Sequence, residues 1–219
     1  MEFGALNGRD FSNTYLLEKI GWNGIVAEPH PHYSELVPAN RNCHISKLCV
    51  FDVSNRTVNF RMVTGRPALS GIGKTQLSDN KRDLRNKYRT VKIQTISLND
   101  LLEKYAAPKV IDFISVDTEG SEYKILKKFD YDRWQVRCFC VEHNHTQRKK
   151  ITRLMSKHGY VSLFPEMSGH DDWWVRSEEV ANLQAVSLDA SEYSDEVFEK
   201  TLHARFRTLR RYRRRLLPD

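Results

Sequence analysis

The sequence lacks the features that would mark a membrane, secreted or disulfide-rich protein. No apolar run approaches the ~18 residues that a membrane-spanning helix needs. The chain begins Met-Glu-Phe-Gly, without the basic stretch and apolar run of a secretory signal, so we expect a cytoplasmic protein with no integral membrane span. Its four cysteines form no Cys-x-x-Cys pair, and we expect reduced, mostly buried thiols.

The positive charge of the chain is concentrated in two basic segments. Residues 205–219 contain seven arginines and one aspartate, and residues 56–92 contain ten lysines and arginines against two aspartates. Since the net charge of the whole chain is only +7, the remaining residues are acidic. The internal basic segment is interpreted either as a contact for an anionic substrate or as a solvated loop.

The length of the chain bounds its domain organisation. At 219 residues it is long enough for one well-buried domain with a short appendage, and too short for two ordinary domains. We expect the domain over residues 1–176 and a helical, arginine-rich extension over residues 177–219. In the extension, apolar side chains recur at helical spacing at Phe206, Leu209, Tyr212 and Leu216. This amphipathic basic helix is expected either to contact a polyanion or membrane surface, or to pack on the domain.

Short apolar runs alternate with segments of helical periodicity, as is typical of an α/β fold with a parallel sheet covered by helices. The expected strands are residues 2–5, 25–27, 45–51, 57–63, 91–96, 110–116, 136–141, 160–164 and 173–175. The expected helices are residues 13–20, 32–40, 98–105, 121–129 and 146–158, the third of them capped by Ser97. Residues 65–88 show no usable periodicity and are expected to form a long loop.

The first candidate site lies near the amino terminus. The stretch from Gly4 to Gly8 follows a strand and precedes a helix, where small residues let a ligand approach the backbone. Glu28 ends the next strand, and a carboxylate there can accept hydrogen bonds from a ribose diol. Phe11 occupies the position at which a dinucleotide fingerprint has its third glycine, which favours an adenosyl ligand without phosphates. The alternative is an ordinary strand-turn-helix with an incidental glutamate.

The second candidate site follows two later strands. Asp117 and Glu119 come after the strand at 110–116, and residues 142–145 (Glu-His-Asn-His) come after the next. Because the carboxyl ends of parallel strands meet at one edge of a sheet, these groups are candidates for a general base or for orienting a substrate hydroxyl. Glu122, inside the following helix, is expected to be solvated or paired with a lysine.

A metal site receives little support from the sequence. His143 together with residues 170–172 (His-Asp-Asp) offers the right ligand types, but they belong to separate strands and show no tight spacing motif. We therefore expect no metal.

The motifs taken together resemble the FkbM methyltransferases. The resemblance covers roughly residues 1–176, in order and with family-like spacing. The segments that carry it are residues 2–8, 12–14, 21–29, 95–102, 111–122, 141–144 and 171–175. The chain starts inside the first strand of the family pattern, so we expect either a fragment or a short natural variant.

The resemblance implies a Rossmann-like class I methyltransferase, with a seven-stranded, mostly parallel sheet and helices on both faces. It implies S-adenosyl-L-methionine as cofactor and O-methylation of a sugar, glycan or glycosylated natural product. The implied cofactor-binding residues are Glu2, Gly4, Ala5, Asn7, Gly8, Ser12, Asn13, Glu28, Pro29, Asp52 and Asp117. Asp117 and Glu119 are implied to lie beside the transferred methyl group, and we add His143 as a candidate catalytic residue because it ends the neighbouring strand.

Two other functions remain open at this stage. The basic segments suggest a nucleic-acid methyltransferase, but the turn at residues 117–120 (Asp-Thr-Glu-Gly) is not the Asn/Asp-Pro-Pro-aromatic turn of base amino-methylation. A catalytically silent binding module recruited by its arginine tail is the other alternative. The joint presence of Glu28, Asp117 and Glu119 favours a working enzyme over that module.

Overall fold

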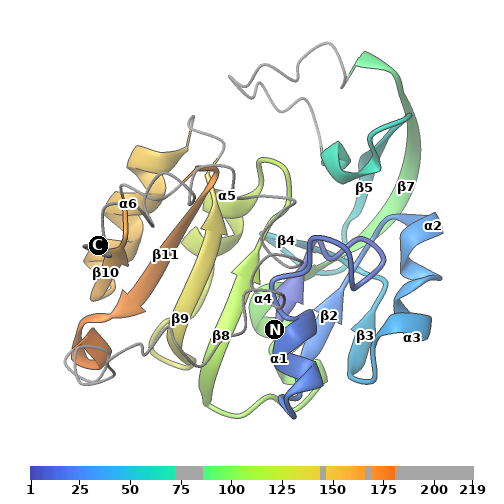
Figure 1. Cartoon of the computed structure of the whole chain (residues 1–219). Helices are drawn as coiled ribbons and strands as arrows, with labels where there is room; N and C mark the ends of the chain where they lie inside the picture. The colour runs from blue at the N-terminus through green and yellow to red at the C-terminus, as the bar shows by residue number, and fades with distance from the viewer. Residues whose placement is uncertain (73–85, 144–146, 166–168, 181–219) are drawn as a thin grey trace, which may run out of the picture.

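The structure is a computed structural model that describes residues 1–72, 86–143, 147–165 and 169–180 (Figure 1). Several predictions fall outside these ranges. They are the arginine-rich helix with its contact to a polyanion or membrane, most of the extension over 177–219, the middle of the loop expected over 65–88, and the side chains of Asn144 and His145.

Seven strands form the main sheet, in the order β10-β11-β9-β8-β1-β2-β3. Their bounds are β1 Glu2–Phe3, β2 Ile25–Ala27, β3 His44–Ser46, β8 Val110–Val116, β9 Gln135–Glu142, β10 Tyr160–Leu163 and β11 Asp171–Arg176. Neighbouring strands from β9 to β3 run parallel, whereas β11 is antiparallel to both β9 and β10. The carboxyl ends of β1, β2, β8 and β9 therefore meet at one edge (Figure 1).

A second sheet of four strands has the order β4-β7-β5-β6. Its strands are β4 Cys49–Phe51, β5 Thr57–Val63, β6 Gly71–Ile72 and β7 Tyr88–Ser97, and only β4 and β7 pair in parallel. Over both described sheets, five strand pairings are parallel and four antiparallel. The predicted seven-stranded sheet is thus present, but the strands form a mixed arrangement instead of the mostly parallel one that the sequence predicts.

Six α-helices connect the strands in the described residues. They are α1 Tyr15–Lys19, α2 Pro31–Ser34, α3 Val37–Asn40, α4 Leu98–Lys104, α5 Glu122–Lys127 and α6 Arg148–Lys157, with short 3-10 helices η1 Pro67–Leu69 and η3 Ser177–Glu179. The single helix predicted over 32–40 is wrong, because Pro38 has no N–H to donate and starts a new helix in its first turn. None of the described helices has the length and apolar character needed to cross a membrane.

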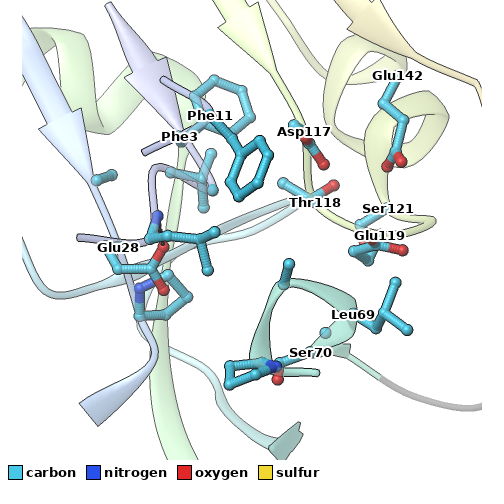
Figure 2. A pocket seen from close by; sticks show the side chains of 18 of the residues that line it. Phe3, Phe11, Glu28, Leu69, Ser70, Asp117, Thr118, Glu119, Ser121 and Glu142 are labelled. Atoms are coloured by element: carbon cyan, nitrogen blue, oxygen red, sulfur yellow. Dashed lines mark hydrogen bonds between the residues drawn. The ribbon is translucent and has the colours of Figure 1, made fainter. Parts of the chain in front are cut away.

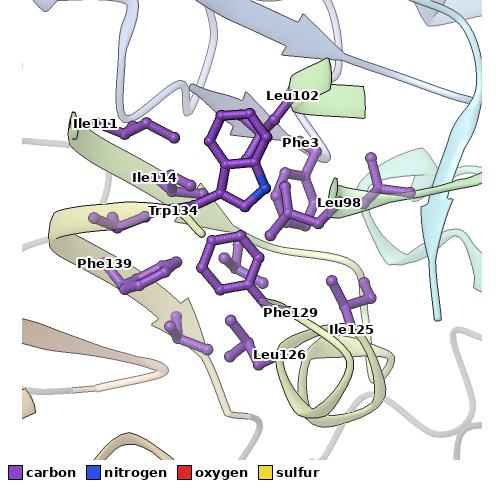
Figure 3. Close-up of a cluster of buried hydrophobic side chains, with 14 of the residues drawn as sticks. Phe3, Leu98, Leu102, Ile111, Ile114, Ile125, Leu126, Phe129, Trp134 and Phe139 are labelled. Atoms are coloured by element: carbon purple, nitrogen blue, oxygen red, sulfur yellow. The ribbon is translucent and has the colours of Figure 1, made fainter. Parts of the chain in front are cut away.

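Hydrophobic side chains lie on both faces of the main sheet. Along β2, Ile25 and Ala27 join the larger core, while Val26 joins a smaller core with Ala5 and Val37. This alternation follows from the two-residue period of a strand. Helices α4, α5 and α6 cover the larger core, shown in Figure 3, and α3 covers the smaller one. Helices on both faces are therefore confirmed. All four cysteines are free, and Cys49 and Cys140 are buried while Cys43 and Cys138 are partly exposed.

Candidate functional site

A cavity of about 1080 Å³ lies at the edge where the carboxyl ends of the parallel strands meet. The ends of β1, β2, β8 and β9 form one wall, and residues 66–72 of η1 and β6 form the opposite wall (Figure 2). Ligand pockets commonly measure ~300–1,000 Å³, so this cavity has room for a cofactor and part of a second molecule.

The glycine after β1 is required by close contact between two strand ends. Gly4 has a φ of +83°, and a Cβ atom on it would lie 1.7 Å from the carbonyl oxygen of Asp117. No other residue fits, because any side chain would collide with the backbone that follows β8. Gly4 therefore brings the two predicted sites, more than a hundred residues apart in sequence, to the same cavity.

Glu28 lies at one end of the cavity, directly after β2. Its side chain is buried, and its two carboxylate oxygens accept hydrogen bonds from the backbone N–H of Leu6 at 2.7 Å and of His30 at 2.8 Å. Burial raises the pKa of Glu28 to about 7 despite these two donors. Each carboxylate oxygen keeps further acceptor capacity for a ligand.

Three carboxylates gather at the other end of the cavity. One oxygen each from Asp117, Glu119 and Glu142 can be chosen so that all lie within 4.8 Å of one another. Figure 2 shows these side chains on the side of the cavity opposite Glu28. Burial, with the neighbouring carboxylates as a further cause, raises the pKa of Asp117 and that of Glu142 well above the ordinary range.

Glu122 stabilises the turn that carries Asp117 and Glu119 by accepting hydrogen bonds from it. One oxygen of Glu122 accepts hydrogen bonds from the backbone N–H and the hydroxyl of Thr118, both at 2.9 Å, and from the backbone N–H of Gly120 at 2.8 Å. The prediction that Glu122 is solvated or paired with a lysine is wrong, because the helix start points this side chain into the turn, where it is 1% exposed. Burial raises its pKa.

Backbone strain is concentrated around the cavity. Six non-glycine residues among those described have positive φ, and four of the six line the cavity. These four are Leu6, Phe11, Glu119 and Phe164. Such conformations cost free energy and cluster where a site must hold a set geometry.

The structure places five of the predicted site residues on the cavity: Gly4, Glu28, Pro29, Asp117 and Glu119. The other predicted cofactor-binding residues are not among the described residues that line it; they are Glu2, Ala5, Asn7, Gly8, Ser12, Asn13 and Asp52. Glu2 illustrates why, because its carboxylate accepts hydrogen bonds from Ser12, Asn13 and Thr14 in a buried network. The contacts of these seven residues with a cofactor stay predictions.

His143 is placed differently from the other catalytic candidates. Its side chain is fully buried, is not among the described residues that line the cavity, and lies 3.7 Å from Asp172. Asp172 in turn forms an ion pair with Arg148 at 2.8 Å. His170 and Asp171 do line the cavity, so the sequence group at 170–172 is divided between the cavity and the protein interior.

Sequence reasoning missed the wall opposite the strand ends. Residues 66–72 were expected to be part of a structureless loop, yet Gly71 packs so closely that a Cβ atom there would lie 3.1 Å from the carbonyl oxygen of Thr118. Glu142 was predicted, with the other residues that follow its strand, as a candidate for a general base or for orienting a substrate hydroxyl, and the structure places it on the cavity. No role at the site was predicted for Phe164 or Trp173, which also line the cavity.

A cavity at the carboxyl ends of parallel strands, with a carboxylate after β2 and an acidic turn after β8, occupies the place where open α/β sheets commonly bind their ligands. The sequence model of the methyltransferase FkbM domain matches residues 2–162. The chain therefore belongs to the FkbM methyltransferase family, whose members have a class I methyltransferase fold and generally use S-adenosylmethionine. Comparisons with curated proteins and with solved structures gave no match.

Proposed function

We propose that the protein is an S-adenosylmethionine-dependent O-methyltransferase that acts on a hydroxyl group of a sugar, glycan or glycosylated natural product. The observation that carries the proposal is one cavity with Glu28 at one end and the carboxylates of Asp117, Glu119 and Glu142 at the other. The two ends suit two different molecules, a cofactor and an acceptor.

The residues at the Glu28 end fit the cofactor. The Glu28 carboxylate is buried and can accept hydrogen bonds from the two ribose hydroxyls in addition to the two backbone donors it already has. S-adenosylmethionine carries a sulfonium cation, and six carboxylates among the described lining residues favour a cation. When bound, the cofactor supplies an electrophilic methyl group.

The residues at the opposite end fit an acceptor hydroxyl. A hydroxyl group is a weak nucleophile at neutral pH, so a base that removes or orients its proton contributes ~10²–10⁴-fold to the rate. Asp117 lies at the end of the central strand, and burial raises its pKa above that of an ordinary aspartate, which makes its carboxylate a stronger base. We assign this role to Asp117, with Glu119 beside it, in preference to His143, which is not among the described lining residues.

Aromatic side chains support an acceptor with apolar faces, such as a sugar ring. Phe11 and Phe164 are each 58% exposed and Trp173 is 44% exposed, although all three line the cavity. Large aromatic groups left open to solvent around a cavity are typical of a binding site.

The charge of the cavity disfavours a nucleic-acid acceptor. Among the described lining residues, Arg66 is the one arginine or lysine, against six carboxylates. A phosphate backbone requires basic contacts, so an acidic cavity repels it.

A catalytically silent binding module is the other alternative. Such a module does not need buried carboxylates on a strained backbone, and their presence at the cavity favours an enzyme.

Mass spectrometry of methyl transfer to a panel of sugars and glycosides tests the proposal. With an accepted substrate, Asp117→Asn should lower kcat by ~10²–10⁴-fold because the base is lost. Asp112→Asn is the matched control: it lies on the same strand, but its exposed carboxylate pairs with Arg137 at the surface. A parent chain that binds S-adenosylmethionine but methylates only nucleic acid, or Asp117→Asn turning over at the parental rate, would contradict the proposal.

A further inference from the structure

We propose that Asp117, Glu119 and Glu142 form a binding site for one divalent cation, Mg²⁺ or Mn²⁺, at the acceptor end of the cavity. Oxygens of the three side chains lie within 4.8 Å of one another. An ion bound at ~2.1 Å holds neighbouring ligand atoms roughly 3–4 Å apart, so small side-chain movements would close this group around it. Carboxylate oxygens are the ligands that such hard cations prefer.

Glu142 provides an observation that does not depend on the spacing. The residue is 6% exposed, and among the described residues its Oε2 atom is buried without a hydrogen-bond partner. Figure 2 shows the Glu142 carboxylate directed toward the end of the cavity where Asp117 and Glu119 lie. A buried carboxylate oxygen without a donor is unfavourable, and a cation at this place would provide the missing partner.

The negative charge of the three carboxylates also favours a cation at this site. Asp117 follows β8 and Glu142 ends the parallel neighbour β9, so their carboxylates lie at the same end of the cavity. Asp171, paired in register with Glu142 on the neighbouring strand, adds a further negative charge near Asp117. A divalent cation would neutralise two of these negative charges.

The sequence predicts no metal, and the only group it suggested was His143 with residues 170–172. The proposed site uses different residues, which come from the ends of two neighbouring strands. Asp117 and Glu119 follow β8, and Glu142 ends β9, which is the parallel neighbour of β8. Glu122 is not part of the site, since its carboxylate is directed to the backbone of the turn.

The ion can bind whether or not the protein transfers methyl groups. The catalytic role of the ion, in contrast, rests on the proposed function. If the proposed function holds, an acceptor hydroxyl bound to the ion would lose its proton more readily, because a metal ion lowers the pKa of an oxygen ligand. The ion would also fix the acceptor oxygen beside the carboxylates.

Titration of the full chain with Mn²⁺, followed by the paramagnetic resonance signal of the free ion, tests the inference. We expect one Mn²⁺ per chain, displaced by Mg²⁺. Glu142→Gln should weaken binding at least about tenfold, since loss of even a supporting residue costs ~10–100-fold. Asp10→Asn, which neutralises another carboxylate lining the same cavity, should change it by no more than roughly twofold.

No Mn²⁺ binding by the parent at millimolar concentrations, or equal weakening by Glu142→Gln and Asp10→Asn, would overturn the inference. Circular dichroism checks folding, and Glu119→Gln carries the same expectation if Glu142→Gln does not fold. Calorimetry with S-adenosylmethionine in the presence of a chelator separates the two proposals. Cofactor binding without Mn²⁺ binding overturns the metal site alone, and Mn²⁺ binding without cofactor binding overturns the proposed function alone.

Discussion

At the scale of single residues, carboxylates that line the cavity are buried, and burial disfavours their ionised form. A carboxylate that leaves water needs donors to replace its hydration. Glu28 has two backbone donors, and its pKa is nevertheless raised by burial to about 7, so near neutral pH the charged and neutral forms are both populated. A ligand that donates hydrogen bonds to the carboxylate then shifts it to the charged form.

Replacing Glu28 by glutamine should weaken S-adenosylmethionine binding. The change removes the negative charge that accepts from the ribose hydroxyls, and loss of such charge-assisted hydrogen bonds costs ~1.5–3 kcal/mol, roughly a factor of ten to a hundred in affinity. Isothermal calorimetry at pH 8 measures it. Glu35→Gln is the control, because that glutamate is exposed and pairs with Lys47 at the surface. Parental affinity in Glu28→Gln would show that the ribose is bound elsewhere.

The pH dependence of S-adenosylmethionine affinity tests whether the negative charge of Glu28 contributes to binding, apart from the shape of its side chain. With a pKa of about 7 in the ligand-free protein, Glu28 loses its proton between pH 6 and 8. Since the ligand favours the ionised form, the parent should bind more tightly as pH rises through this window. Glu28→Gln should lack this part of the pH dependence, and an identical profile in both proteins would exclude Glu28 as its source.

At the scale of elements, sequence periodicity predicted strands and helices well where local signals decide. The strands expected over 25–27, 57–63 and 110–116 have those bounds, and Ser97 caps α4 by accepting from the backbone N–H of Asp100 at 3.1 Å. The strand expected over 45–51 is instead two strands in two sheets. An apolar run indicates that a segment is buried, but it does not indicate which sheet each part of the segment joins.

The turn after β8 depends on Glu122, and Glu122→Ala should destabilise the protein. The substitution leaves two N–H groups and one hydroxyl of the turn without their acceptor, which we expect to cost roughly 2–4 kcal/mol of unfolding free energy. Urea unfolding followed by circular dichroism measures the loss. Because the turn carries Asp117, kcat should fall as well.

Glu103→Ala provides the comparison for that substitution. Glu103 lies on α4, its side chain is 59% exposed, and it pairs with Arg133 at 3.2 Å. Exposed ion pairs contribute ~0–1 kcal/mol, so its loss should be small. If Glu122→Ala were no more destabilising than Glu103→Ala, the turn would be held by other contacts, such as the hydrogen bond from Gln147 to the carbonyl of Gly120.

At the scale of the whole molecule, the net charge of the chain and the charge of the described cavity lining have opposite signs. The chain has a net charge of +7, yet the lining of the cavity is acidic. The excess positive charge belongs to residues 56–92 and 205–219, and the second of these segments lies outside the described residues.

Deleting residues 205–219 should leave S-adenosylmethionine affinity within roughly twofold of the parent, since the described residues that line the cavity all come earlier in the chain. The same deletion should weaken retention on heparin or on acidic vesicles, and salt should diminish the difference. Calorimetry and salt elution measure the two effects. A truncated chain that is folded but does not bind the cofactor would show that the tail contributes to the site.

The sequence alone determined the features that depend on neighbouring residues. Strand and helix periodicity, the helix cap at Ser97 and the order of motifs that marks the FkbM family all lie within short stretches of chain, where local sterics and spacing decide. The positions of Glu28, Asp117 and Glu119 at the cavity followed too, because residues just after parallel strands share one edge of the sheet.

Only the tertiary structure decided which side chains meet. Glu142 reaches Asp117 because β8 and β9 are neighbours, and Glu122 enters the turn because of the direction in which α5 begins. The opposite wall comes from β6, whose Gly71 packs against the turn after β8. Strand order, helix direction and side-chain orientation are fixed by packing between distant segments, and a single sequence carries no local signal for them.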